Sequence, residues 1–177
     1  MEEIIKMIDE ETINSRILKL ADRINKDYKD EELLIIPVLK GGVMFASDLI
    51  KNLKMPITLD FIITSSYKDK TVSSGNVEII KWVDEDITGK NILLVDDIID
   101  TGRTLLHLKE KLIIEQPKSI ALCTLLDKPD RREVAIDSDY VGFTIENEFV
   151  VGYGLDYNKQ CRNLPYIGKV KKIGSIK

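Results

Sequence analysis

Short apolar runs alternate along this chain with segments in which apolar residues recur at every third or fourth position. That helical spacing predicts an amphipathic helix over residues 12–28, with Thr12 as its N-cap, and two further helices over 43–53 and 104–114. Continuous or alternating apolar runs predict the strands, which are residues 33–39, 57–64, 77–83, 91–95, 118–126 and 140–145. The run at 33–39 is apolar throughout, so we expect that strand to be buried on both faces.

The order of these elements, strand then helix then strand, is typical of an α/β fold with a mostly parallel central sheet flanked by helices. A chain of 177 residues is long enough for one domain with its own core. Ligands of open α/β sheets bind at the carboxyl ends of the strands. Lys40, Asp96 and Asp127 each lie just past the end of a predicted strand, so one cleft can collect all three side chains.

The segment 92–105 gives the strongest indication of chemistry. An apolar strand ends at the adjacent carboxylates Asp96 and Asp97, Asp100 follows, and a helix then begins with Thr101, Gly102, Arg103 and Thr104. Adjacent carboxylates repel each other unless a cation or hydroxyl donors lie between them, and Mg²⁺ suits such hard oxygen ligands. A helix N-terminus favours an anion such as phosphate. Helix capping would explain one carboxylate, but three around a Gly-centred turn predict a site for a phosphorylated ligand with hydroxyls or a metal.

Composition and charge exclude several other functions. The net charge of −4 and the pI near 5.2 provide no basic field for nucleic acid or a membrane surface, so neither is an expected partner. Cys123 and Cys161 are too few for a disulfide framework, and with His107 as the single histidine a zinc site is not expected. The N-terminus lacks the features of a signal peptide and no apolar run is long enough to span a bilayer, so we expect a cytoplasmic protein.

Several blocks of sequence resemble the hypoxanthine-guanine phosphoribosyltransferases, a branch of the type I phosphoribosyltransferase family. Residues 92–105 resemble the family's phosphoribosyl-pyrophosphate loop, and Val-Leu-Lys-Gly-Gly at 38–42 resembles its pyrophosphate loop. The other blocks are similar to the flexible loop and the purine-binding hood, and they are residues 65–67 with 73–75, 125–129, 149–157 and 162–166. All occur in the family's order within about residues 33–168, so the resemblance covers nearly the whole domain.

The resemblance implies the type I phosphoribosyltransferase fold for a single domain over residues 1–177. Its core would span about 33–126, its chain ends (the N-terminal segment and about 127–177) would form a small hood, and a flexible loop would occupy 65–75. The implied reaction belongs to purine salvage. It is the Mg²⁺-dependent transfer of the 5-phosphoribosyl group from phosphoribosyl pyrophosphate to N9 of hypoxanthine or guanine, giving IMP or GMP and pyrophosphate. A homodimer or homotetramer is the usual assembly in this family.

The resemblance also implies which residues bind phosphoribosyl pyrophosphate and carry the chemistry. Asp100 would act as the general acid/base at N7 of the purine. A cis peptide bond is implied at Leu39–Lys40, and either Arg131 or Arg132 would assist in binding pyrophosphate. The residues that would contact phosphoribosyl pyrophosphate are Lys40, Gly41, Asp96, Asp97, Thr101, Gly102, Arg103, Thr104 and Arg162.

The purine and the metal have their own implied residues. Lys128 would donate to the purine O6, Phe149 would stack on the base and Val150 would meet its edge through the backbone. Ser66 and Tyr67 of the flexible loop would close over the reaction centre. The implied Mg²⁺ ligands are Asp96, Asp97 and Asp156.

Two alternatives share much of this pattern. A xanthine-preferring phosphoribosyltransferase would carry the same motifs, because backbone atoms largely read the 2-position of the base. An RNA-binding pyrimidine attenuation regulator has the same fold and similar Val-Asp-Asp and Thr-Gly-Arg-Thr segments, but its RNA surface should be basic. The acidic net charge, Asp100 and the purine hood disfavour the regulator. The family usually has Glu where this chain has Asp96, so contact of this shorter side chain with the ribose would pass through water or metal.

Overall fold

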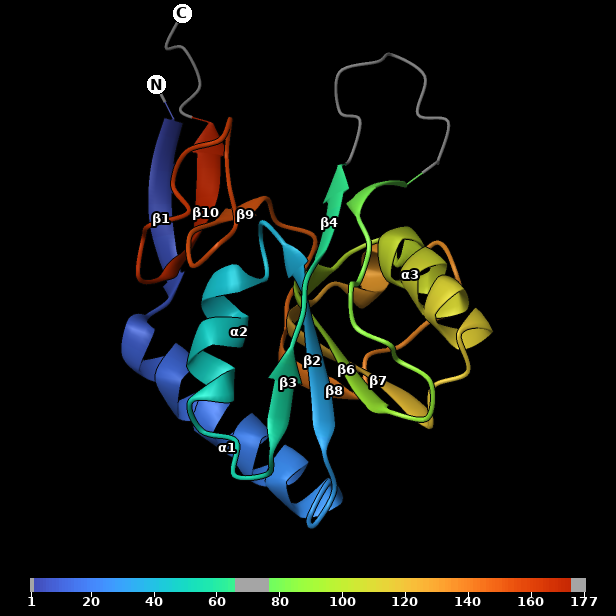
Figure 1. Ribbon diagram of the computed structural model, residues 1–177. Coiled ribbons are helices and arrows are strands. Elements are labelled where there is room, and N and C mark those ends of the chain that lie inside the picture. The colour runs from blue at the N-terminus through green and yellow to red at the C-terminus, as the bar shows by residue number, and fades with distance from the viewer. Residues whose placement is uncertain (1, 66–76, 173–177) are drawn as a thin grey trace, which may run out of the picture.

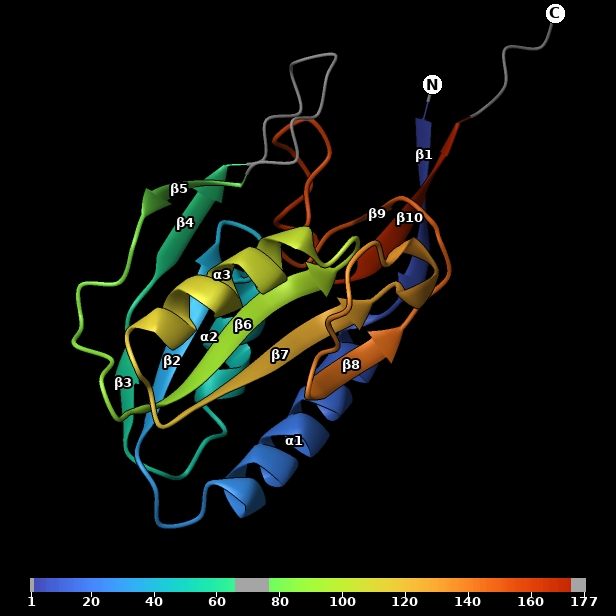
Figure 2. The ribbon, with the colours of Figure 1, turned by 90° about the vertical axis from the view of Figure 1, so that its right-hand side faces the viewer.

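The computed structural model describes residues 2–65 and 77–172, which form a large sheet of mostly parallel strands with helices on both faces (Figures 1 and 2). The strands of this sheet, in chain order, are β2 (Leu33–Leu39), β3 (Ile57–Leu59), β4 (Ile62–Ser65), β5 (Glu78–Lys81), β6 (Asn91–Ile99), β7 (Ser119–Asp127) and β8 (Tyr140–Thr144). They are ordered β5-β4-β2-β6-β7-β8 across the sheet, with β3 also paired to β2. All the neighbours pair in parallel except β4 and β5. The predicted α/β class is confirmed.

The predicted strand at 57–64 is in fact two strands, β3 and β4, which pair with successive halves of β2. The chain between them is fixed by the buried carboxylate of Asp60. That carboxylate accepts hydrogen bonds from the Lys81 ammonium and from the backbone N–H groups of Phe61, Asp84 and Glu85. Three of these partners, Lys81, Asp84 and Glu85, lie 21 to 25 residues further along the chain, so the apolar pattern of the strand does not reveal the break.

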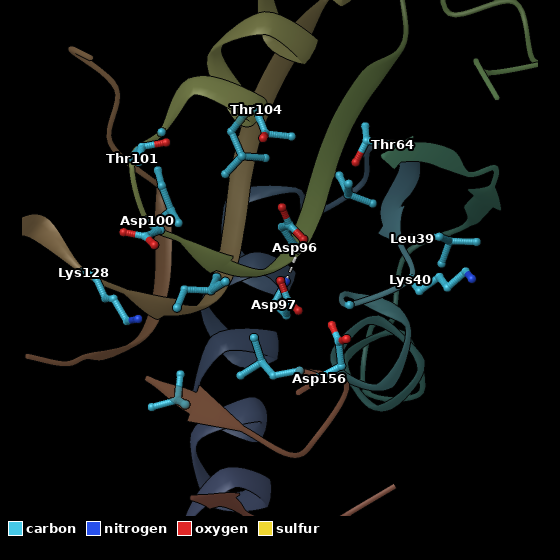
Figure 3. Close-up of a pocket in the computed structure, with 18 of the residues that line it drawn as sticks. Leu39, Lys40, Thr64, Asp96, Asp97, Asp100, Thr101, Thr104, Lys128 and Asp156 are labelled. Atoms are coloured by element: carbon cyan, nitrogen blue, oxygen red, sulfur yellow. Dashed lines mark hydrogen bonds between the residues drawn. The ribbon is translucent and has the colours of Figure 1, made fainter. Parts of the chain in front are cut away.

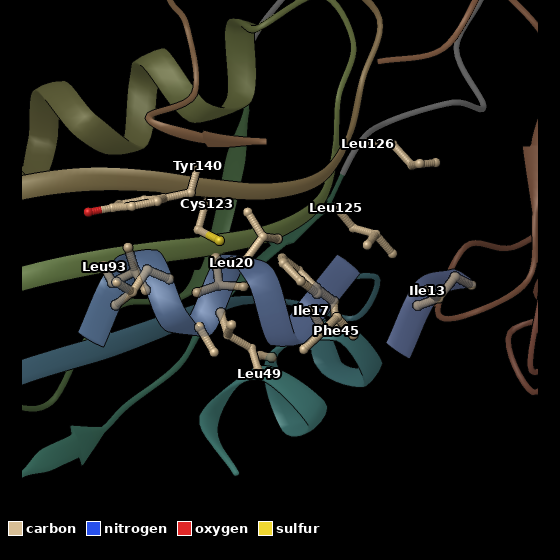
Figure 4. Packing of buried hydrophobic residues seen from close by; sticks show 14 of the residues in the cluster. Ile13, Ile17, Leu20, Phe45, Leu49, Leu93, Cys123, Leu125, Leu126 and Tyr140 are labelled. Carbon is tan, nitrogen blue, oxygen red and sulfur yellow. The ribbon is translucent and has the colours of Figure 1, made fainter. Parts of the chain in front are cut away.

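Helices cover both faces of the large sheet. On one face lie α1 (Glu10–Asp27) and α2 (Val43–Ile50), whose buried residues pack with those of the sheet in one cluster (Figure 4). On the other face lies α3 (Arg103–Ile114), which contributes to a second cluster. The predicted N-cap Thr12 is wrong: α1 begins earlier, and the Asp9 carboxylate accepts a hydrogen bond from the Thr12 N–H over 2.8 Å.

Strand β6 continues past its predicted end at Val95 to Ile99. Its neighbour β7 supplies backbone partners along this extension, where Asp96 lies opposite Thr124 and Ile99 lies opposite Asp127. Asp96 and Asp97 therefore belong to a paired strand rather than to a loop, and pairing with β7 limits the positions available to their backbone.

A smaller antiparallel sheet joins the two ends of the described chain. It consists of β1 (Glu2–Ile8), β10 (Ile167–Lys172) and β9 (Val150–Val151), in the order β1-β10-β9. Figures 1 and 2 both place this sheet beyond the carboxyl ends of the large sheet. None of these three segments was predicted as a strand. Among the residues that the structure describes, no helix is long and apolar enough to cross a membrane.

Candidate active site

A cavity of about 360 Å³ opens at the carboxyl ends of β2, β6 and β7 (Figure 3). Segments from most of the chain length contribute to its lining. Of the residues predicted from the sequence, the structure brings together Lys40, Gly41, Asp96, Asp97, Asp100, Thr101, Gly102, Thr104, Lys128, Phe149, Val150, Asp156 and Arg162. The predicted flexible-loop residues Ser66 and Tyr67 lie outside the described residues.

The acidic pair lies near the centre of the cavity (Figure 3), and each carboxylate residue is only 9% exposed. The backbone N–H of Asp97 donates to the Asp96 carboxylate over 2.9 Å. Burial and the neighbouring charge of Asp97 raise the pKa of Asp96 well above its usual range. Burial also raises the pKa of Asp97, although hydrogen bonding to Asp96 and the charge of Arg162 oppose this rise. The raised pKa values mean that the charged forms of the two carboxylates are disfavoured here, and a cation or hydroxyl donors between them would offset that cost.

The loop after β2 passes directly against this pair. A Cβ atom on Gly41 would lie 1.8 Å from Oδ2 of Asp97, so a larger residue would require the carboxylate or the loop to shift. The peptide bond between Leu39 and Lys40 is cis, as the family resemblance implies. The Lys40 side chain is exposed and points away from the acidic pair (Figure 3), which leaves the loop backbone to face the cavity.

The turn before α3 presents a helix N-terminus to the cavity. Gly102 is the N-cap with φ of +83°, in the left-handed region that favours glycine. Thr101 and Thr104 line the cavity beside the N–H groups of the first helical turn, an arrangement suited to a phosphate. Arg103 does not line the cavity, because its side chain pairs with Glu133 over 2.6 Å.

Asp100 follows β6 directly and lines the same cavity. Its carboxylate accepts a hydrogen bond from Nε of Arg131 over 3.1 Å, in a pair whose side chains are 45% and 40% exposed. Arg132 donates instead to the Asp100 backbone carbonyl and to the Asp127 carboxylate. Neither arginine lines the cavity, so the structure does not place Arg131 or Arg132 where either was expected to assist with pyrophosphate.

The end of the cavity beside β7 holds the residues expected to contact a purine. Lys128 is only 7% exposed, and its backbone N–H donates to the Ile99 carbonyl over 3.0 Å. Phe149 is 48% exposed and meets Tyr157 edge to face with ring centroids 5.6 Å apart. Val150 is buried in β9. A flat aromatic ligand could lie against Phe149 with a polar edge toward Lys128.

The opposite rim of the cavity carries an oriented ion pair. Arg162 donates to the Asp156 carboxylate over 2.7 Å and also to the carbonyl of Gly154. Gly154 in turn packs on the backbone of the loop after β2, since a Cβ atom there would lie 2.2 Å from the Gly41 carbonyl oxygen. The rim is thus built from two segments more than 100 residues apart in the sequence.

The sequence interpretation missed some residues that line the cavity. Thr64 enters from the end of β4, and Leu105 and Leu155 add apolar surface. Thr64 had a usable signal, because it falls at the carboxyl end of a predicted strand. Nothing in their local pattern distinguishes the two leucines from core residues.

The mostly parallel α/β sheet, with carboxylates and a helix N-terminus at its carboxyl edge, has the fold of a type I phosphoribosyltransferase. A family model described as the phosphoribosyl transferase domain matches residues 6–158. The chain therefore belongs to the phosphoribosyltransferase family, and within it to the branch of hypoxanthine and hypoxanthine-guanine phosphoribosyltransferases.

Individual relatives support this assignment over almost the full chain. The chain is 48% identical to the hypoxanthine phosphoribosyltransferase of Salmonella typhimurium, with 93% of each chain covered. It is 44% identical to the hypoxanthine-guanine phosphoribosyltransferase of Streptococcus thermophilus, with 94% of this chain and 92% of that protein covered. A crystal structure of a hypoxanthine-guanine phosphoribosyltransferase from Bacillus anthracis matches with a TM-score of 0.91 and 44% identity, covering 97% of this chain and 100% of the other.

Proposed function

We propose that this protein is a Mg²⁺-dependent enzyme of purine salvage that converts hypoxanthine or guanine, with phosphoribosyl pyrophosphate, into IMP or GMP and pyrophosphate. The observation that carries the proposal is one cavity that combines three features. These are the N-terminus of α3 for a phosphate, the buried pair Asp96 and Asp97 for ribose hydroxyls, and the buried Lys128 for a polar ring atom. The names of the relatives support the same substrates.

In the proposed reaction, N9 of the base forms a bond to C1′ of the ribose while the bond from C1′ to a pyrophosphate oxygen breaks. The electron pair of the broken bond leaves with pyrophosphate, and positive charge develops on the ribose. Catalysis then depends on positioning the two substrates and stabilising the leaving group. Asp100 would take the proton from N7 of the base, while Thr101, Thr104 and the first N–H groups of α3 hold the 5-phosphate.

Lys128 would select the base. An ammonium group has donors and no acceptor, so it suits the O6 atom of a 6-oxopurine better than the amino group of adenine. The half-exposed ring of Phe149 would stack on the base, and the backbone of Val150 would meet the edge of the base. Xanthine has the same O6 atom, so this contact by itself does not separate xanthine from hypoxanthine and guanine.

The residues present fit a magnesium ion. Asp96 and Asp97 are adjacent, buried and raised in pKa, a situation that a divalent cation relieves, and Asp156 provides a further carboxylate on the rim. The described residues contain no group of three His, Cys, Asp or Glu side chains that would enclose a metal alone. Substrate oxygens would complete the coordination, as is usual for Mg²⁺. When bound, the ion would neutralise the charge of the pyrophosphate group.

Several exposed apolar side chains support the proposal of a homodimer or homotetramer. Val43 and Met44 at the start of α2 are 39% and 40% exposed, and Ile57 and Leu59 of β3 are 39% and 41% exposed. Exposed apolar residues mark a subunit interface where they form a contiguous patch, and we propose that role for α2 and β3. Light scattering across a concentration series tests the assembly, and a monomer at all concentrations would contradict it.

The enzyme assay combines purified protein, Mg²⁺ and phosphoribosyl pyrophosphate with hypoxanthine, guanine, xanthine and adenine in separate reactions. We expect nucleotide formation from hypoxanthine or guanine and little from adenine. Faster turnover of xanthine would replace the proposed substrate within the same reaction. Absence of nucleotide from any base, together with RNA binding that weakens steeply with salt, would instead support the regulator on this fold.

The Asp100→Asn variant tests the proposed proton acceptor. We expect kcat to fall by about 10²–10⁴-fold, while KM for phosphoribosyl pyrophosphate changes far less, because the amide keeps the shape of the side chain but cannot accept the proton. Asp137→Asn is the matched control, since Asp137 is exposed and does not line the cavity. Equal losses in binding and turnover at position 100 would remove the general acid/base role.

A further inference from the structure

Arg132 connects two parts of the site from outside the cavity. It does not line the cavity, yet its guanidinium donates to the backbone carbonyl of Asp100 and to the carboxylate of Asp127. Asp127 is the last residue of β7 and pairs in register with Ile99, the last residue of β6. We infer that Arg132 is a positioning residue that fixes Asp100 and the phosphate-binding turn from behind.

The first support is burial. The Arg132 and Asp127 side chains are 14% and 18% exposed, so this ion pair is largely shielded from solvent. A shielded carboxylate that loses its partner is costly, and the surrounding backbone then rearranges to reach water or another donor. Arg131 offers a contrast, because its pair with the Asp100 carboxylate is exposed and such pairs contribute little.

The second support is the packing around the turn. A Cβ atom on Gly102 would lie 3.0 Å from Cδ of Arg132, so the arginine side chain lies against the N-cap of α3. The next residue, Glu133, donates its backbone N–H to the carbonyl of Thr101 over 3.0 Å. Arg132 and Glu133 thus contact the segment from Asp100 to Gly102, and all three residues of that segment also line the cavity.

The third support is the chemistry of the guanidinium. Its donors have fixed directions in one plane, so one side chain can hold a carbonyl and a carboxylate at a defined separation. A lysine ammonium is a single nitrogen and cannot keep both contacts in the same geometry. The side chain therefore acts as a rigid connection between the end of β7 and the residue after β6.

This inference rests on the proposed function, since Asp100 is the expected general acid/base. A displacement of about 1 Å of a reacting group can cost about 10²-fold in turnover. We expect Arg132→Met to lower kcat by about that factor, with a smaller change in KM for hypoxanthine. Arg132→Lys should recover part of the loss, because it keeps the charge beside Asp127 but holds the carbonyl less well.

The experiment measures kcat, KM and the thermal unfolding midpoint for wild type, Arg132→Met, Arg132→Lys and the control Arg23→Met, whose side chain on α1 is 60% exposed and does not line the cavity. Amide hydrogen exchange of residues 99–104 is recorded for each folded variant. Faster exchange in this segment, a selective loss of kcat and partial recovery with lysine support the positioning role. Unchanged kcat and exchange in folded Arg132→Met, or a loss of activity that matches only a smaller folded fraction, would overturn the inference. If Arg132→Met does not fold, the comparison of Arg132→Lys with wild type decides by the same criteria.

The two hypotheses fail separately. A wild-type protein that forms no nucleotide contradicts the proposed function, whereas hydrogen exchange still tests whether Arg132 fixes residues 99–104. An active wild type with an unaffected Arg132→Met variant contradicts only the positioning role.

Discussion

At the scale of single residues, the site depends on a close approach between a glycine and a carboxylate. The missing side chain of Gly41 lets the loop after β2 lie against Asp97, and Gly154 packs against the backbone of the same loop. The carboxylate is thereby enclosed by backbone, which contributes to the burial that raises its pKa. The loop and the acidic pair form one structural unit, even though they are far apart in the sequence.

Gly41→Ala should disrupt this unit. The added Cβ would overlap Oδ2 of Asp97, so either the loop or the carboxylate must move. We expect kcat/KM for phosphoribosyl pyrophosphate to fall by at least about 10²-fold, because both groups lie at the proposed substrate site. Steady-state kinetics measures this loss.

Gly89→Ala provides the control for the loss of a glycine. Gly89 also has positive φ, at +69°, but no atom lies within 4 Å of its added Cβ. That variant should lose about 1 kcal/mol of stability with normal kinetics. Unchanged kinetics in Gly41→Ala would contradict the close approach.

At the scale of elements, the joint between β3 and β4 depends on one buried carboxylate. Burial alone would raise the pKa of Asp60, but hydrogen bonds from the N–H groups of Glu85 and Phe61 and from Lys81 outweigh it and bring the pKa to about 2. The chain leaving β5 is held by the same carboxylate, through Asp84 and Glu85. This joint therefore holds the start of β4 against the segment that leaves β5.

The pH dependence of stability tests this joint. The pKa of Asp60 is lower in the folded protein than its ordinary value of 3.8, so its contribution is present above pH 3.8 and is lost as pH falls toward 2. We expect about 2 kcal/mol of unfolding free energy to disappear over that range. Denaturant unfolding of wild type and Asp60→Asn at several pH values measures the difference.

The variant should be less stable at neutral pH and should lack this part of the acid dependence. Asp22→Asn is the control, since Asp22 is exposed on α1, away from the partners of Asp60. Parallel pH curves for wild type and Asp60→Asn would contradict the assignment.

At the scale of the whole molecule, buried tyrosines attach peripheral segments to the helices. Tyr153 follows β9 and donates to Asp48 on α2, while Tyr140 of β8 donates to Asp27 on α1. Burial and the accepting carboxylate raise the pKa of each phenol. The first of these bonds joins the segment that carries the cavity residues Phe149 and Val150 to α2, the helix after the loop that contains Gly41.

Comparing Tyr153→Phe with Tyr140→Phe distinguishes an effect of the Tyr153 connection on binding of the base from a general loss of stability. Each variant loses one buried hydrogen bond and should lose about 1 kcal/mol, or about 2–4 °C in the unfolding midpoint. Only Tyr153→Phe should also raise KM for hypoxanthine, because only that tyrosine anchors the segment beside Phe149 and Val150. Thermal unfolding and steady-state kinetics test both expectations. An equal change of KM in the two variants would contradict the connection.

The sequence by itself determined the element types, the α/β class and the chemical character of the segment 92–105. These features depend on periodicity and residue type among near neighbours, which the sequence displays directly. Tertiary structure decided what depends on distant partners: the break at Asp60, the extension of β6 beyond Val95 and the strands at the chain ends. It also decided that Arg103 pairs with Glu133 outside the cavity, whereas Gly41 lies against Asp97. Contacts between residues far apart in the chain are fixed only when the sheet and its loops are assembled, so local patterns do not contain them.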